Sequence, residues 1–353
     1  MTPDWAIKAN GKDATSAFRP YLLEIRVRDE SKDEADSLTI VLDNSDAALQ
    51  PPEQGDELEV LLGYRNDLRS LGRFIVDSVT FDGPPDRVTI ACKAAAFAEQ
   101  GDAESAAGNP EGLGLQSWLV RKSRSWEAGT LEVIAKKVAA EHGVDLVANA
   151  GVLALTLPHI DQTDESDTEL LYRILKPRGY LLKVADKKLV LLPRSGGDNK
   201  NPKTQQTVPT VVIRRTEVST YSGRWAERGV YDKAVAYWHN VSTGQPVYVT
   251  AGTGNKVFRF KHPAPDEATA QKWAKSMVKE SKGEAGHMAI SMPGRVDIQS
   301  EQRLRLEGFT YPLSASPSKD AVAKEWVVKS VEHSLTRGGF TTSVQGEPFI
   351  QET

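Results

Sequence analysis

The chain has little cysteine, no long apolar run and no excess of positive charge, and each shortage excludes a class of protein. Its one cysteine, Cys92, rules out an internal disulfide and lies in an alternating segment, which predicts a buried thiol rather than a nucleophile. No apolar run approaches the ~20 residues of a transmembrane helix. The start has no basic segment followed by an apolar core, so we expect no signal peptide. The formal net charge of −4 predicts no bulk attraction to nucleic acid or anionic membranes.

Motifs for common catalytic and metal sites are also missing. The six histidines are scattered, without the H-E-x-x-H spacing of a zinc site, and one cysteine argues against structural zinc. Neither a phosphate-binding G-x-x-x-x-G-K-[ST] segment nor a G-x-S-x-G nucleophile elbow occurs. The sequence therefore predicts no catalytic residue, no metal and no cofactor, and we expect a protein that is not an enzyme.

The first hundred residues have the pattern of a β domain. Apolar side chains alternate with other residues in 38–42 and 58–62, and again in 74–79 and 88–92. The last two segments flank 81–86, a turn rich in Gly, Pro and Asp. Short strands joined by such turns are typical of a barrel or a sandwich.

Two polar segments divide the rest of the chain. Residues 101–114 are rich in Gly, Ala and Ser, and 196–209 are polar with two prolines. We therefore predict a mainly β fold with an α+β insertion, in three domains: a first β domain over 1–105, the α+β domain over 106–200, and a second β domain over 201–353. The second β domain carries an inserted helix near 266–282, after Pro265.

The two β domains share a possible internal repeat. Residues 74–79, FIVDSV, align with 326–331, WVVKSV, and each segment leads into a turn that contains glycine. Upstream, 58–64 align with 304–309 if one residue is deleted. Alternating strands also resemble each other by chance, so the alignment leaves two hypotheses open: a duplicated β domain and a coincidence of pattern.

The segment 158–184 contains an acidic run that precedes an amphipathic pattern. Ser166 and Glu169 have the S-x-x-E spacing of a capping box. Asp164, Glu165 and Asp167 are expected to place negative charge beside the positive end of the helix dipole. Leucines and isoleucine then follow at helical spacing until Pro177, so we interpret the acidic run as a helix entrance.

Two functional interpretations of the acidic residues remain beside this structural one. The run 161–167 can in principle hold the carboxylate pair of a glycoside hydrolase that degrades cell walls. Residues 29–59 hold eleven acidic residues and one lysine, which suits either a solvated surface or a pore lining that repels DNA. A receptor-binding module is a third functional alternative, because it would suit the β content.

Several segments together resemble the phage late control protein D family, the baseplate hub proteins of contractile tails. The resemblance rests on 34–40, 55–58, 72–77, 81–85, 326–333 and 338–340, and on the acidic run. The signature residues of that run are Asp161, Gln162, Thr163, Glu165, Ser166, Asp167 and Glu169. The match is looser between 205 and 255. Proteins of this family are similar to the T-even baseplate hub and to the N-terminal part of type VI secretion spike proteins.

The resemblance implies a fold and a mechanism. Each subunit is expected to carry two tube-like β-barrel domains, and three subunits to form a ring of six barrels. Such a ring adapts the sixfold tail tube, or its initiator protein, to a threefold central spike. The implied protein is a structural part of the virion baseplate or of a tail-like particle. It is expected to assemble in the host cytoplasm and, in a particle that carries DNA, to let the DNA pass through its lumen without specific binding.

Overall fold

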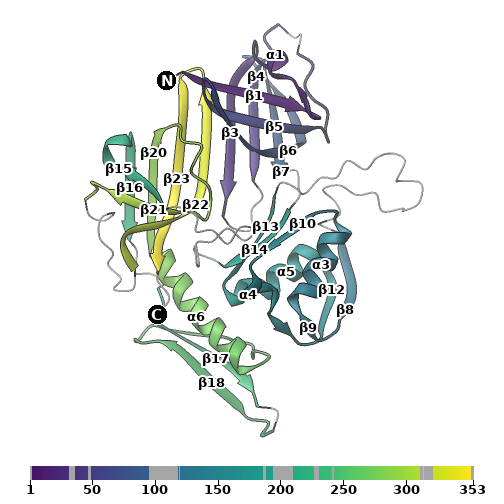
Figure 1. Cartoon of the computed structure of the whole chain (residues 1–353), viewed down its shortest axis with the longest axis vertical. Coiled ribbons are helices and arrows are strands. Elements are labelled where there is room, and N and C mark those ends of the chain that lie inside the picture. The colour runs from purple at the N-terminus through teal and green to yellow at the C-terminus, as the bar shows by residue number, and fades with distance from the viewer. Residues whose placement is uncertain are drawn as a thin grey trace, which may run out of the picture.

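A computed structural model places most of the chain. It describes residues 2–31, 36–46, 49–94, 118, 120–185, 188–193, 210–225, 230–240, 242–310, 313 and 321–350. Strands dominate the fold, as predicted. Figure 1 shows purple strands from the N-terminal part beside green and yellow strands from the C-terminal part, with a teal α+β domain below the purple strands. The predicted linkers at 101–114 and 196–209 lie outside the described residues, and so do both predicted domain boundaries.

One sheet of thirteen strands runs through both β regions. Its order is β2-β1-β5-β6-β7-β4-β3-β22-β23-β20-β16, and β21 pairs with β22 and with β15. The path among the described strands is open, with β2 and β16 at its ends. No closed barrel is therefore formed by the described strands.

We call the N-terminal part of this sheet the first unit. It contains β1 (Pro3–Ala9), β2 (Lys12–Asp13), β3 (Leu22–Glu30), β4 (Ser37–Asp43), β5 (Glu57–Tyr64), β6 (Asp67–Asp82), β7 (Arg87–Ala94) and the short helix α1 (Thr15–Phe18). Alternation puts one face of each strand inward, so Ile40, Leu58 and Ile90 are fully buried in one core. Cys92 lies in this core, and burial raises the pKa of its thiol to about 12.

We call the C-terminal part of the sheet the second unit. It contains β15 (Val211–Arg214), η4 (Arg215–Glu217), β16 (Thr220–Trp225), β20 (Gly286–Pro293), β21 (Arg303–Glu307), β22 (Ala321–Thr336) and β23 (Gly339–Ile350). Its separate core includes Met288, Ile290 and Trp326. The two units are joined where β3 pairs antiparallel with residues 330–336 of β22.

The strand pairing agrees with the repeat alignment. In the first unit Leu58 pairs with Phe74, and in the second unit Leu304 pairs with Trp326. These are the residues that the sequence alignment makes equivalent. A bulge then follows at the same place in both units, after Val76 in β6 and after Val328 in β22.

The turn before β5 matches the turn before β21. Gly55 and Glu301 both have positive φ, +96° and +63°. The amide of Gly55 donates to the carbonyl of Val76, and the amide of Glu301 donates to the carbonyl of Val328. Shared register, bulge and turn favour a repeated β unit over a chance likeness of alternating strands. They do not extend to the edge strands, because β1 runs antiparallel to β5 whereas β15 runs parallel to β21.

The α+β domain has its own core between two helices and a mixed sheet. Its elements are β8 (Arg121–Trp126), β9 (Gly129–Thr130), α3 (Leu131–Glu141), β10 (Asp145–Ala148), α4 (Ala150–Leu153), β11 (Thr156–Leu157), β12 (Ile160–Ser166), α5 (Asp167–Leu175), η3 (Lys176–Arg178), β13 (Tyr180–Ala185) and β14 (Lys188–Pro193). The apolar faces of α3 and α5 pack into one cluster with Leu189 and Leu191 of β14. Gly179, with φ +74°, makes the turn into β13.

A smaller subdomain projects from the second unit. It consists of β17 (Lys233–His239), β18 (Pro246–Gly252), β19 (Val257–Arg259) and α6 (Glu267–Glu284), at the bottom of Figure 1. The predicted helix near 266–282 is α6, and Asp266 caps it by accepting from the Thr269 amide at 2.8 Å. Ala270 and Ala274 of α6 pack against Ala234 and Ala236 of β17.

Candidate functional site

The acidic run forms a strand before it reaches the helix. Residues 160–166 are β12, which pairs antiparallel with the basic strand β8. The interpretation of the whole run as a helix entrance is therefore wrong for 161–165, where cross-strand pairing to β8 sets the conformation. Asp164 lies at a bulge with φ +47°, and its carboxylate meets Arg121 at 3.3 Å instead of the helix end.

The predicted capping box at the start of α5 is confirmed. The hydroxyl of Ser166 accepts from the Glu169 amide at 3.2 Å, and the Glu169 carboxylate accepts from the Ser166 amide at 2.8 Å. Two of the free N–H groups at the helix start are thereby satisfied. Glu165 lies one residue before the cap, and its carboxylate forms a two-pronged ion pair with Arg173.

Asp167, the first residue of α5, is completely buried and surrounded by donors. One carboxylate oxygen accepts from Arg124 at 2.6 Å and from Gln162 at 2.9 Å. The other accepts from Lys122 at 2.7 Å and from His142 at 2.9 Å. A buried carboxylate with four donors is fully satisfied, so this residue locks β8, β12, α3 and α5 together.

The electrostatics keep this carboxylate ionised. Burial alone would raise the pKa of Asp167, but hydrogen bonds from His142, Lys122 and Gln162 and the charge of Arg124 hold that pKa far below its usual range. Glu141 at the end of α3 also contacts two of the cations of β8, Lys122 at 3.1 Å and Arg124 at 2.7 Å. The pKa of Glu141 is lowered because those contacts outweigh its partial burial.

Gln162 is the signature residue that ties the run to β8. Its side chain is buried, accepts from Arg124 and from the indole of Trp126, and donates to the Glu165 carbonyl at 2.8 Å. Sequence reasoning named Gln162 but missed the cations of β8 and missed His142, whose ring stacks on Trp118 with centroids 3.8 Å apart. The closely spaced Arg121, Lys122 and Arg124 were the available signal.

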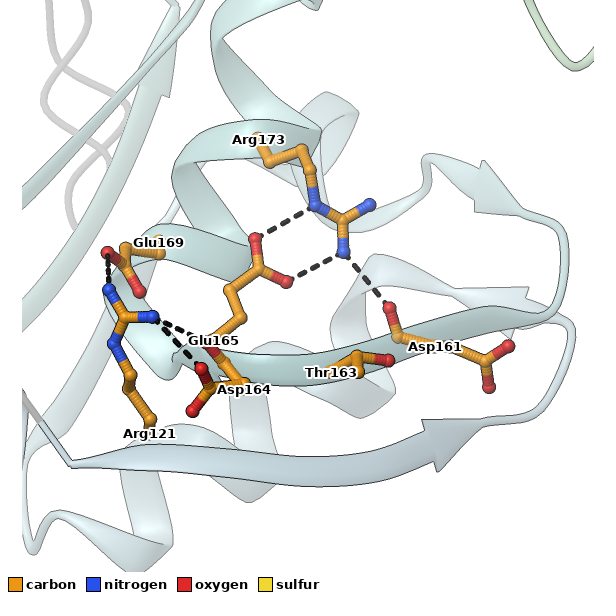
Figure 2. A pocket seen from close by; sticks show the side chains of 7 residues that line it. All are labelled: Arg121, Asp161, Thr163, Asp164, Glu165, Glu169 and Arg173. Atoms are coloured by element: carbon orange, nitrogen blue, oxygen red, sulfur yellow. Dashed lines mark hydrogen bonds and ion pairs between the residues drawn. The ribbon is translucent and has the colours of Figure 1, made fainter.

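The exposed signature residues line a surface groove, shown in Figure 2. Its walls are formed by Arg121, Asp161, Thr163, Asp164, Glu165, Glu169 and Arg173. Figure 2 shows that the two arginines face the carboxylates: Arg121 meets Asp164 and Glu169, and Arg173 meets Glu165 and the Asp161 carbonyl. The charges of the groove are therefore largely paired within it.

Two carboxylates of this groove have pKa shifts opposite to the raised pKa that the acid of a glycoside hydrolase needs. The hydroxyl of Ser125 and the ring of His159 lower the pKa of Asp161, and hydrogen bonds from Ser166 lower the pKa of Glu169. In the described part of the chain, no group of His, Cys, Asp and Glu side chains is arranged to hold a metal ion. Within the same residues, no helix is both long and apolar enough to span a membrane.

Solved tail proteins have the same fold. The 43 kDa tail protein of prophage MuSo2 from Shewanella oneidensis superposes with a TM-score of 0.68 over 98% of both chains, at 15% identity. The E. coli c3393 protein superposes with a TM-score of 0.54 over 94% of this chain and 74% of that protein, at 12% identity. That protein is described as a component of the type VI secretion system with structural similarity to the phage T4 tail proteins gp27 and gp5.

Sequence comparisons agree with the structural ones. The probable baseplate hub protein of Escherichia phage P2 is 25% identical over 98% of this chain and 93% of its own length. The model of the phage tail baseplate hub (GPD) family matches residues 115–339, which include the acidic run, the α+β domain and most of the second unit. Because this match covers more than half of the chain, the protein belongs to the phage tail baseplate hub (GPD) family.

Proposed function

We propose that this baseplate hub is a non-enzymatic homotrimer whose ring adapts a sixfold tail tube to a threefold central spike. In this proposal each subunit contributes its two β units as two tube-like barrels, so that three subunits present six similar units. One face of the ring meets the tube or a tube-initiator protein, and the other holds the spike. The protein would act in the tail baseplate of a virion or tail-like particle, after assembly in the host cytoplasm.

The observation that supports this proposal is the shared register of the two units. Equivalent pairs, Leu58 with Phe74 and Leu304 with Trp326, are followed by equivalent bulges. Two copies of one β unit within a chain allow three chains to present six nearly equivalent surfaces. A sixfold tube and a threefold spike can both bind such a ring.

The acidic segment 29–59 bears on the proposed passage of DNA. Several of its carboxylates have cations beside them: Glu59 meets Lys8 at 2.9 Å, and Asp29 and Asp36 both meet Lys183. Those acids therefore serve local structure. The proposal keeps passage without specific binding, and the chain's net charge of −4 suits it.

The test is negative-stain imaging of the purified chain at high concentration, with two-dimensional averaging. We expect threefold rings with six similar lobes around a central opening, and no release of sugars from peptidoglycan by the same sample. Rings with three lobes would keep the trimer and contradict the equivalence of the units. Single compact particles at every concentration would contradict a ring that forms without other proteins. Sugar release that is lost in an Asp161→Asn variant would favour the hydrolase alternative.

A further inference from the structure

A groove runs along the outer edge of β6 in the first unit. It is lined by residues 51–54 on one side and by Asp77, Ser78, Val79 and Phe81 on the other. Residues 78–82 of β6 pair with β7, but no described strand pairs with their opposite edge. Phe81 is 62% exposed there, which is unusual for a phenylalanine in a strand.

In the second unit, the equivalent strand edge is covered by β3. Residues 330–336 of β22 are the counterparts of β6 from Ser78 onward, and their outer edge pairs with β3. The amide of Ser31 donates to the carbonyl of Lys329, the bulge residue equivalent to Asp77. The Asp29 carboxylate accepts a hydrogen bond from the Ser300 amide at 2.8 Å. Ser300 is the residue of the second unit that is equivalent to Gln54. The edge of β6 in the first unit is thus equivalent to the edge of β22 that pairs with β3, but it has no partner strand among the described residues.

The strand that fills the joint also has a counterpart with an open edge. In the first unit β3 pairs with β4, and in the second unit β16 pairs with β20, the counterpart of β4. Matching these registers makes Arg224 equivalent to Arg28, and Gly223 equivalent to Val27. The strand β16 ends the described sheet, so its outer edge has no partner among the described strands.

We propose that β16 of one copy of this chain pairs antiparallel with residues 78–82 of β6 in the next copy. The occupant of the groove is thus a second copy of the chain, bound as β3 is bound to β22. Transferring the register of that internal joint places Thr80 opposite Arg224 and Phe81 opposite Gly223. The pairing would satisfy the unpaired backbone N–H and C=O groups of both strand edges, which folded proteins otherwise protect.

The side chains on the two edges complement each other. Phe81 faces a glycine in this register, and an aromatic side chain covers the bare backbone of a cross-strand glycine well. Arg224 lies diagonal to Asp82, two residues along from Thr80, which brings opposite charges within reach. The internal joint also has a diagonal pair of opposite charges, on the other diagonal, since Arg26 lies 3.8 Å from Glu332, the partner of Arg28.

This joint is head-to-tail, because it brings different edges of two identical chains together. A head-to-tail contact closes into a ring when its rotation returns to the start and otherwise grows as a filament. The inference rests on the proposed trimeric ring and specifies which strands build it. In such a ring the internal β3–β22 joint alternates with the β16–β6 joint between copies.

Disulfide trapping tests the register. Thr80 and Arg224 are both exposed, so the double variant Thr80→Cys, Arg224→Cys should fold normally. Directly opposed cysteines in an antiparallel pair lie within the Cα separation that a disulfide needs. We expect oxidation to give covalent dimers and trimers of the full-length chain on non-reducing gels, with no product beyond three copies. Each single variant should stay uncrosslinked, because its cysteine faces no second cysteine.

Two matched variants set the scale. Arg28→Cys, Glu332→Cys occupies the same positions in the internal joint and should form a disulfide within one chain, without dimers. Thr80→Cys, Ser222→Cys is out of register by two residues and should crosslink at least tenfold more slowly. Light scattering on each sample gives the number of copies independently of crosslinking.

The outcomes separate this inference from the proposed function. Covalent trimers that stop at three copies support both. A trimer by light scattering without crosslinks overturns the joint and keeps the ring. Crosslinked ladders beyond three copies support the joint and overturn the closed ring. An uncrosslinked monomer at the highest soluble concentration overturns both, and crosslinking by the single variants overturns the head-to-tail arrangement.

Discussion

Each β unit has a bulge at the equivalent position, but the surroundings of the two bulges differ. In the first unit the bulge residue Asp77 pairs with Lys93 across the strands at 3.4 Å. In the second unit the equivalent Lys329 pairs with Glu347, so the geometry is kept while the charges are exchanged. Lys329 lies inside a joint, whereas Asp77 borders an open groove. The neighbouring strand, and not the β unit itself, therefore determines whether the bulge residue is shielded or lies at the surface.

The two units also fill equivalent core positions with side chains of different size. Leu38 lies opposite Cys92 in the first unit, and at the equivalent positions Met288 lies opposite Gly346 in the second. The longer methionine fills the space that a side chain on residue 346 would take. Such exchanges between facing positions keep a core at its close-packed density.

The internal joint holds a polar cluster that links the first unit, the second unit and the α+β domain. Lys183, from β13 of the α+β domain, contacts Asp29 at 2.5 Å, Asp36 at 3.0 Å and the Ser300 hydroxyl at 3.2 Å. Burial raises the pKa of Asp36 to about 6, although Lys183 opposes that rise. Asp29 accepts two further hydrogen bonds from Ser300 and keeps a lowered pKa despite its burial.

Breaking this cluster is expected to have the largest effect. Lys183→Met leaves the carboxylates of Asp29 and Asp36 facing each other without their cation, at a cost of about 3 kcal/mol of unfolding free energy. Urea denaturation of the two proteins measures the loss. The matched control is Lys93→Met, which removes the cation of the exposed pair in the first unit and should cost less than about 1 kcal/mol. Equal losses would contradict the difference between joint and open edge.

The next largest effect is expected in the second core. In Gly346→Cys, which copies the first unit, the new Cβ would lie 2.9 Å from the Val327 carbonyl oxygen and 2.7 Å from the Met288 methyl. Such overpacking costs about 2 kcal/mol. Adding Met288→Leu relieves the methyl contact alone, so we expect about half of the loss to return. Gln345→Cys on the exposed face of β23 is the control, and a loss there as large would contradict the volume argument.

The sequence predicted the parts of this fold that depend on local pattern. Alternation located β4, β5 and β7, the capping box located the start of α5, and Pro265 marked the start of α6. These signals are set by neighbours in the chain. The alignment of 74–79 with 326–331 also found strands that prove equivalent in register. The same reasoning missed β8 and β12, whose charged residues hide any apolar alternation.

The sequence could not predict what depends on distant residues. Asp167 looked like one more acid at a helix start, but its donors Lys122 and Arg124 come from 45 and 43 residues away. Nothing local marks them as its partners. The β3–β22 joint unites strands some three hundred residues apart in the chain. Its polar cluster also needs Lys183 from the inserted domain, so only the folded chain reveals it.

Reversing the bulge pair in the second unit is expected to have the smallest effect. Lys329→Asp alone places two acids together and should cost about 1 kcal/mol, because Lys329 and Glu347 are only 27% and 13% exposed. Adding Glu347→Lys copies the order of charges in the first unit and should restore most of the loss. The corresponding exchange of Asp77 and Lys93 should change stability by about 0.3 kcal/mol at most, since those side chains are 40% and 53% exposed. Double-mutant cycles in urea give both coupling energies. A coupling in the first unit as large as in the second would contradict the exposure of the Asp77–Lys93 pair in a single chain. A second copy of the chain bound at the β6 groove would account for such shielding.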